Sequence, residues 1–347
     1  MTSSSKPINT ITIDKEHTAG FLNKLIKSFR VVAPVDNGKT IRFQEIKSSD
    51  EIKLDYSNTK LASKEILFPQ TEILFTVKKK DGKTVIEEPA PIEKDWVIFG
   101  VRPCDAKGLE NSFKVFASGA HKDRAYLEKR EKSIVIGYAC ETPMSTCFCT
   151  SVGGSPSGRE GMDMLFTDLG DKYLVEILTQ RGAGLMEQAE GTKQPAKEEL
   201  EAAQRLWDSA ETSITEILDL EGLEEKLDKM FDDPIWDELS QKCIGCGTCA
   251  YLCPTCLCFD ILDEETPEGV KRIRTWDTCQ FPIFTLHASG HNPRPGSKER
   301  VRQRIMHKFC YFPHEHGHTS CVGCGRCIRE CPVGHDIREV LVRLEEA

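Results

Sequence analysis

The sequence has no long hydrophobic run. No stretch of about 18 uncharged apolar residues is present to span a membrane, and residues 1–6, Met-Thr-Ser-Ser-Ser-Lys, lack the apolar segment of a signal peptide. We therefore expect no membrane insertion and a location in the reducing cytoplasm. The formal net charge of −9 at pH 7 argues against nucleic acid as a partner, because an acidic surface repels a polyanion.

Signatures of catalysis and nucleotide binding are also lacking. The glycine-rich residues 152–156 match neither the dinucleotide-binding fingerprint nor a phosphate-binding loop. Asp163 and Asp168 are isolated acids rather than a pair arranged for acid-base catalysis, and no Ser-His-Asp pattern stands out. These absences favour a chain that carries no catalytic site of its own.

Cysteine, by contrast, is abundant, with 16 residues among 347. Eight of them form two copies of the spacing Cys-x2-Cys-x2-Cys-x3-Cys-Pro. The first copy is Cys243, Cys246, Cys249 and Cys253, and the second is Cys321, Cys324, Cys327 and Cys331. In two-cluster ferredoxins, three cysteines of each copy bind one 4Fe-4S cluster and the fourth binds the other cluster. We interpret these eight residues as the ligands of two 4Fe-4S clusters that carry electrons.

The surrounding residues agree with clusters better than with zinc or disulfides. Glycines stand inside both copies, where the missing Cβ lets the backbone approach inorganic sulfide; they are Gly245, Gly247, Gly323 and Gly325. A third cysteine at the same short interval is surplus to a tetrahedral zinc ion bound by two Cys-x2-Cys pairs. Disulfides are not needed, because a chain of this length buries an ordinary core.

The length predicts about two domains, and the pattern predicts an α+β protein. We expect an N-terminal α/β domain with a mixed sheet over residues 1–180, a helical linker over 181–233, and a mostly α-helical dicluster ferredoxin domain over 234–347. Two β-hairpins are expected, with strands at 73–77 and 84–86 and at 164–166 and 173–175. Two buried strands are expected at 96–99 and 134–136.

Helices are expected in the C-terminal half. Apolar residues at three- and four-residue steps predict a helix from about 195 to 231. The gap between the cysteine copies, residues 254–320, is long enough for helices, for which 283–286 and 301–309 are candidates. The basic residues 298–304 would divide between two helix faces, Lys298 and Arg302 on one and Arg300 and Arg304 on the other. The alternating His314, His316 and His318 are interpreted as part of a solvated loop rather than as a zinc site.

Four cysteines of the N-terminal half suggest a third cluster. Cys104 and Cys140 each follow a predicted strand, and strand ends are where α/β folds collect ligands. Cys147 and Cys149 form a tight Cys-x-Cys, which indicates chelation more than packing. The alternative is that all four are buried thiols. Whether a further cluster is bound by the last group of cysteines stays an open question at this point; the group is Cys256, Cys258, Cys279 and Cys310. Cys310 lies among aromatic residues typical of a core.

Several segments together resemble one family of redox subunits. They are 101–105 (Val-Arg-Pro-Cys-Asp), 140–149 (Cys-Glu-Thr-Pro running into Cys-Phe-Cys), 253–260 (Cys-Pro-Thr-Cys-Leu-Cys-Phe-Asp), 276–279 (Trp-Asp-Thr-Cys) and 290–294 (Gly-His-Asn-Pro-Arg). Residues 95–347 resemble the beta subunit of sulfhydrogenase, the iron-sulfur subunit of anaerobic sulfite reductase, and that of the flavin oxidoreductase complexes linked to heterodisulfide reductase.

This resemblance implies an electron relay in a cytoplasmic anaerobic complex. The implied partners are a FAD/NAD(P)-binding reductase subunit on one side, with a hydrogenase, sulfite reductase or heterodisulfide reductase subunit on the other, and the resemblance does not choose among them. An alternative is a catalytic reductase whose N-terminal domain binds its own flavin or substrate. Another is a scaffold whose clusters only hold the fold together.

Overall fold

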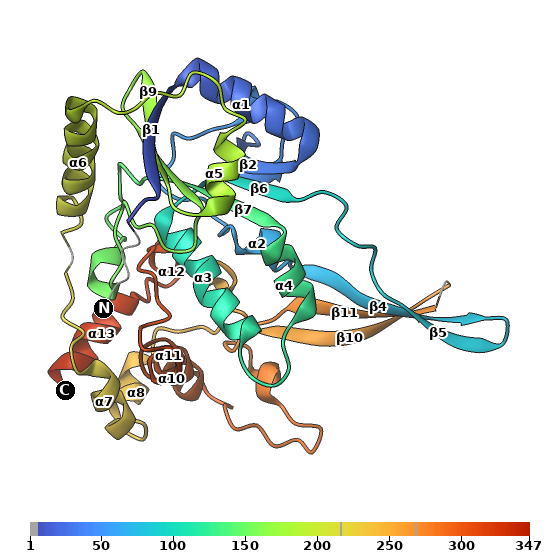
Figure 1. Cartoon of the computed structure of the whole chain (residues 1–347). Coiled ribbons are helices and arrows are strands. Elements are labelled where there is room, and N and C mark those ends of the chain that lie inside the picture. The colour runs from blue at the N-terminus through green and yellow to red at the C-terminus, as the bar shows by residue number, and fades with distance from the viewer. Residues whose placement is uncertain (1–5, 216, 268) are drawn as a thin grey trace.

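The computed structural model describes residues 6–215, 217–267 and 269–347, so the expectation for residues 1–6 falls almost wholly outside it. The described chain is an α+β protein with two β-sheets, as expected (Figure 1). No helix in this part of the chain is both long enough and apolar enough to cross a membrane.

The larger sheet has seven strands in the order β1-β9-β8-β7-β6-β2-β3. Their bounds are β1 Asn9–Asp14, β2 Arg30–Asp36, β3 Ile41–Glu45, β6 Trp96–Val101, β7 Ser133–Tyr138, β8 Met164–Asp168 and β9 Lys172–Ile177. The neighbours β2, β6, β7 and β8 run parallel, whereas β1, β3 and β9 pair antiparallel with their neighbours. The expected mixed sheet and the expected β8-β9 hairpin are therefore confirmed.

Helices cover both faces of this sheet, which explains why its central strands are apolar throughout. On one face lie α1 (Lys15–Ser28) and α5 (Gln180–Met186), and on the other α3 (Pro103–Ala117) and α4 (Arg124–Glu131). Successive residues of β6 enter the two different cores: Val97 packs with the first pair of helices and Ile98 with the second, and neither is exposed.

The second sheet has four antiparallel strands and corrects one expectation. It consists of β4 (Thr71–Lys80), β5 (Lys83–Glu87), β10 (Phe259–Thr266) and β11 (Gly269–Trp276), in the order β10-β11-β4-β5. The β4-β5 hairpin was expected, and its turn has positive φ at Asp81 and Gly82. The β10-β11 hairpin was not, because its strands are held by polar pairs such as Asp263 with Arg272 and show no apolar stripe. Figure 1 shows this sheet extending from the body as a ribbon.

The expected helix over 195–231 is also corrected, because the structure divides it. The segment forms α6 (Lys197–Thr212) and α7 (Leu223–Lys229), with Gly222 at φ 71° before α7. Leu218, in the intervening segment, turns into the C-terminal core with Leu223 and Leu227 instead of continuing the stripe of α6.

The remaining helices surround the two cysteine copies. They are α2 (Lys64–Leu67), α8 (Ile235–Leu239), α9 (Thr248–Tyr251), α10 (Ser297–Met306), α11 (Phe312–His316), α12 (Arg326–Arg329) and α13 (Ile337–Glu346). A 3-10 helix at Pro282–Thr285 and the run of α10 into a π-helix at His307–Tyr311 match the two helical pieces expected between the copies. The core of these helices includes Phe148 and Val152 from the N-terminal half.

Candidate iron-sulfur sites

The twin cysteine copies line two cavities and exchange their last members. One cavity, which we call the outer cavity, is lined by the thiols that begin the first copy and by the last cysteine of the second: Cys243, Cys246, Cys249 and Cys331. The other, the central cavity, is lined by Cys253, Cys321, Cys324 and Cys327. Cys327 lines the outer cavity as well. With Cys327 counted in the central set, each cavity has three cysteines from one copy and one from the other, the exchange found in two-cluster ferredoxins.

The four N-terminal cysteines line a third cavity, which we call the N-terminal cavity: Cys104, Cys140, Cys147 and Cys149. Cys104 lies at the start of α3, directly after β6, and Cys140 follows β7, so both stand at the same edge of the sheet. Cys147 and Cys149 come from the loop after β7, which folds back toward that edge. The structure therefore brings together all four residues that the sequence grouped.

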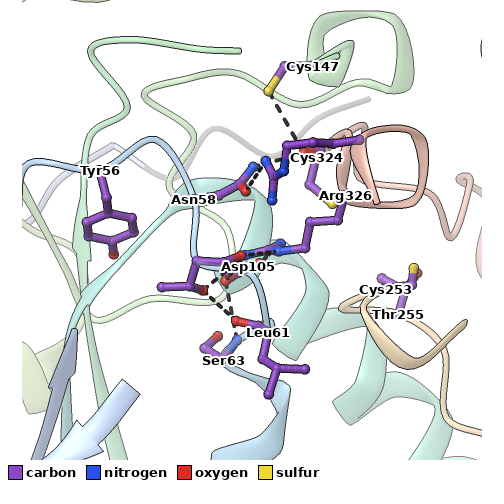
Figure 2. Close-up of polar contacts among 12 residues, drawn as sticks. Tyr56, Asn58, Leu61, Ser63, Asp105, Cys147, Cys253, Thr255, Cys324 and Arg326 are labelled. Atoms are coloured by element: carbon purple, nitrogen blue, oxygen red, sulfur yellow. Dashed lines mark hydrogen bonds and ion pairs between the residues drawn. The ribbon is translucent and has the colours of Figure 1, made fainter. Parts of the chain in front are cut away.

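The three cavities adjoin one another in a row. Cys324 lines both the N-terminal and the central cavity, and Cys327 lines both the central and the outer cavity. The loop and the second copy touch directly, because the Phe148 N–H donates to the Gly323 carbonyl at 2.9 Å. The Cys147 thiol also donates to the Cys324 carbonyl at 3.9 Å (Figure 2).

A glycine makes the contact between the loop and the second copy possible. Gly323 has φ 61°, and a Cβ there would stand 2.5 Å from the Cys149 backbone. Gly325, with φ 73°, would place a Cβ 2.5 Å from the Thr146 carbonyl oxygen. No side chain fits between the two cavities at these points, which keeps the two groups of thiols close together.

The spacing of the thiols suits a cluster better than a single ion. Four thiolates around one zinc ion, with Zn–S bonds of about 2.3 Å, would lie about 3.8 Å apart. In the described residues, one trio of side chains, Asp228, Cys310 and His314, has its candidate ligand atoms within 4.8 Å of one another. This trio includes none of the cysteines that line the three cavities. The three cavities therefore offer ligand sets for a larger, polynuclear group.

Comparisons with known proteins agree with this geometry. Residues 242–335 match the family model of a 4Fe-4S dicluster domain. Over 338 residues the chain is 32% identical to sulfhydrogenase 2 subunit beta of Pyrococcus furiosus, and the match covers 97% of this chain and 98% of that protein. The chain belongs to the sulfhydrogenase beta-subunit family. No solved structure matches it.

Membership of the sulfhydrogenase beta-subunit family confirms the resemblance drawn from the cysteine-containing segments. Together with the dicluster domain, it makes the chain an iron-sulfur electron-transfer subunit that binds 4Fe-4S clusters. The cysteines of the two copies lie inside the matched residues 242–335, whereas the four cysteines of the N-terminal half that line the N-terminal cavity lie outside this range.

A buried ion pair joins the two halves of this sulfhydrogenase beta-family chain. Arg326 of α12 donates to both carboxylate oxygens of Asp105, at 2.6 and 2.9 Å, and both side chains are buried (Figure 2). Asp105 follows Cys104, and Arg326 lies between Cys324 and Cys327. Asn58 adds a hydrogen bond of 2.9 Å to the Cys324 carbonyl. No local pattern indicates the ion pair, since its members are 221 residues apart.

Buried thiols and buried cations shape the electrostatics of the three cavities. Burial raises the pKa of Cys321 to about 11 and the pKa of Cys149 to about 12, and a thiol must lose its proton before it can bind a metal. Lys308 is 3% exposed and its Nζ donates to the Cys253 thiol at 3.3 Å. Burial lowers the pKa of Lys308, but the Cys253 and Cys256 thiols outweigh burial and raise it.

Helix α10 divides its basic residues as the helical spacing predicts. Lys298 pairs with Asp237 at 2.7 Å, and Arg302 donates to the Phe231 carbonyl at 2.7 Å. Arg300 and Arg304 are buried on the other side, and Arg304 lines both the central and the outer cavity. One face of the helix therefore places positive charge beside the cluster cavities.

The interpretation of the three alternating histidines as a solvated loop is corrected in part, because the first two are helical and the third lies in the loop before Cys321 with its ring against α3. His314 and His316 belong to α11, and His318 accepts or donates a 3.0 Å hydrogen bond with Asn111 of α3. His314 lies 3.2 Å from Asp228, whose other oxygen accepts a 3.2 Å hydrogen bond from the buried Cys310 thiol. Cys310 is in the core as expected, and an ion pair and a thiol hydrogen bond account for this trio.

Proposed function

We propose that the chain relays electrons through three 4Fe-4S clusters, held in the outer, central and N-terminal cavities by the twelve cysteines that line them in sets of four. The observation that carries this proposal is the row of adjoining cavities, in which Cys324 and Cys327 each form a shared wall. Transfer between neighbouring clusters requires such proximity. The cysteines supply thiolate ligands, and the glycines and buried cations set the spacing and the local charge.

Both ends of the row reach the protein surface. Cys246, in the outer cavity, is exposed, and Ile244 beside it is 65% exposed. At the other end, Cys104 and Cys149 also line a separate cavity of about 330 Å³. The central cavity is enclosed, because Cys253, Cys321 and Cys324 are all buried. Electrons would enter at one end and leave at the other.

The partners follow from the relative and remain part of the proposal. A subunit of a sulfhydrogenase complex would receive electrons from, or pass them to, a hydrogenase catalytic subunit. The other partner would be a FAD/NAD(P)-binding reductase subunit, and sulfite reductase or heterodisulfide reductase subunits are the alternatives to the hydrogenase. A cytoplasmic location fits, because thiolate ligands require a reducing compartment.

The third cluster is tested by metal analysis of matched variants. Protein purified without oxygen is compared with Cys147→Ser, which removes one ligand of the N-terminal cavity. We expect the variant to lose about four iron atoms per chain and to keep the two clusters of the dicluster domain. An unchanged iron content in Cys147→Ser would reduce the relay to the dicluster alone.

A second candidate function has an observation of its own. A cavity of about 480 Å³ lies at the carboxyl ends of β6 and β7 and is lined by Tyr56, Phe99, Arg102, Tyr138 and other residues, including Glu141 next to Cys140. Its size and its aromatic walls suit a flavin or a small substrate. Flavin released by denaturing the isolated chain would support a reductase that binds its own flavin, and its absence would favour the relay.

A further inference from the structure

Three cysteines outside the proposed clusters converge at the base of the β10-β11 hairpin. Cys258 directly precedes β10 and Cys279 follows β11, and antiparallel pairing of the strands brings these two positions together. The Asp277 N–H donates to the Cys258 carbonyl at 3.0 Å. The register of the two strands thus brings Cys258 close to the segment that holds Cys279, although the two cysteines lie about 20 residues apart in the sequence.

The third cysteine links this pair to the relay. Cys256 is two residues before Cys258, and its thiol lies 3.7 Å from Nη1 of Arg304, which lines the central cavity. Cys279 also accepts a 3.5 Å hydrogen bond from Gln280. We call Cys256, Cys258 and Cys279 the hairpin thiols. They lie beside the central cavity and do not line any of the three cavities assigned above.

Buried positive charge surrounds the hairpin thiols. Lys64 is 2% exposed, and its Nζ donates to the Cys256 carbonyl at 2.7 Å and lies 4.2 Å from the centre of the Trp276 ring. Arg304 is 9% exposed, and its Nη1 is 3.7 Å from the Cys256 thiol. Lys308 contacts Cys253, as described above. Within the described residues, none of these three cations forms an ion pair with a carboxylate.

Arg304 and Lys308 are buried cations without carboxylates and need a negative group of another kind, because a buried charge is costly unless it is paired. The central cluster accounts for Lys308, which contacts its ligand Cys253. Arg304 also contacts the Cys256 thiol, and Lys64, whose pKa burial lowers, donates to the Cys256 carbonyl. An anionic group on the hairpin thiols would meet this charge.

We propose that Cys256, Cys258 and Cys279 bind a further iron-sulfur cluster. The site would supply three thiolates and leave one coordination position for a ligand other than cysteine. When a cluster carried by a scaffold protein is transferred, each hairpin thiol forms one Fe–S bond while the scaffold thiolate on that iron leaves and takes up the proton. This inference goes beyond the three-cluster relay, because it places a branch beside the central cavity, at the base of the projecting sheet.

Two simpler interpretations fit less well. A single zinc ion needs its ligand atoms closer together than the hairpin thiols are, since these three are not among the trios that lie within 4.8 Å in the described chain. A regulatory dithiol would use Cys258 and Cys279 alone, and it would explain neither Cys256 nor the buried Arg304 guanidinium 3.7 Å from its thiol.

The test compares full-length chains purified without oxygen. Cys279→Ser and Cys258→Ser each remove one hairpin thiol, and Cys310→Ser is the matched control, because Cys310 is buried but contacts Asp228 rather than the other cysteines. We expect the first two variants to lose about three to four iron atoms per chain, with the matching sulfide, and the control to lose none. Electron paramagnetic resonance should show one signal missing and the dicluster signals retained.

Other results would overturn the proposal. These are an unchanged iron content in Cys279→Ser and Cys258→Ser, zinc in place of iron, or a disulfide between Cys258 and Cys279 in the purified wild type. If both variants fail to fold, the iron content of Cys147→Ser decides, because this variant lacks a ligand of the N-terminal cavity: about 11 to 12 iron atoms support the further cluster, and about 8 exclude it. The result is separate from the test of the relay, because Cys147→Ser reports on a different cavity.

Discussion

The two halves of the chain assemble their cysteines in different ways. In the C-terminal half, short intervals place three thiols of one copy at each cavity, and the other copy completes the set. In the N-terminal half, the thiols come from the ends of β6 and β7 and from the following loop, and the sheet brings them together. The first kind of site is visible in the sequence spacing, whereas the second depends on the fold.

The N-terminal site also depends on the other half, and this dependence is not symmetrical. Its loop packs on Gly323 and Gly325, and its Phe148 enters the C-terminal core. The outer cavity is lined wholly by residues of the C-terminal half. We therefore expect damage at the junction to affect the N-terminal cluster more than the outer one.

The largest effect is expected where the halves share a residue. Cys324 would bind the central cluster and lines the N-terminal cavity as well. Cys324→Ser should lower electron transfer through the purified complex by on the order of 100-fold or more and destabilise the C-terminal helices, because ligation is coupled to folding. Cys246→Ser, at the exposed end, should block transfer with less effect on folding. Full activity of either variant would contradict the relay.

The next largest effect tests the dependence of one half on the other. Gly323→Ala would place a Cβ against the Cys149 backbone and should cost the protein the iron of the N-terminal cluster, about four atoms per chain. The control is Gly334→Ala, which has nearly the same φ, 62° against 61°, but no atom within 4 Å of the new Cβ. The control should therefore carry only the backbone strain, about 1 kcal/mol. Equal iron loss in both variants would mean that strain, not contact, is responsible.

A third change weakens the junction without touching a cluster ligand. Asp105→Ala would leave Arg326 buried and unpaired, which should lower the free energy of unfolding by about 3 to 5 kcal/mol. The control is the exposed pair of Lys24 with Glu190, because Lys24→Ala should change the free energy of unfolding by about 1 kcal/mol or less. Guanidinium titrations without oxygen measure both. A similar small loss for the two variants would show that the halves do not depend on this ion pair.

The sequence was informative wherever function is encoded by local spacing. It predicted the grouping of the eight cysteines of the two copies, and the strand ends correctly placed Cys104 next to Cys140. It missed the β10-β11 hairpin, because polar cross-strand pairs leave no apolar alternation to detect. It also missed Asp105 with Arg326, since a contact between residues so far apart depends on how the two halves pack. Long-range packing is thus where interpretation from one sequence ends.

The smallest effect concerns charge rather than assembly. Lys308 is buried beside Cys253, so Lys308→Met removes a positive charge next to the central cluster. Reduction adds negative charge to a cluster, and losing the cation makes that less favourable, so the potential of the central cluster should fall by on the order of 50 mV. The control is Lys298→Met, on the solvent face of the same helical region. This variant should leave the potential of the central cluster unchanged, because Lys298 pairs with Asp237 and not with a cysteine. A redox titration followed by electron paramagnetic resonance measures the shift. The outer cavity is lined by Arg304 and not by Lys308, so the potential of the central cluster alone should shift. Such a confined shift would show that each cluster keeps its own charge environment even though the two halves of the chain contact each other.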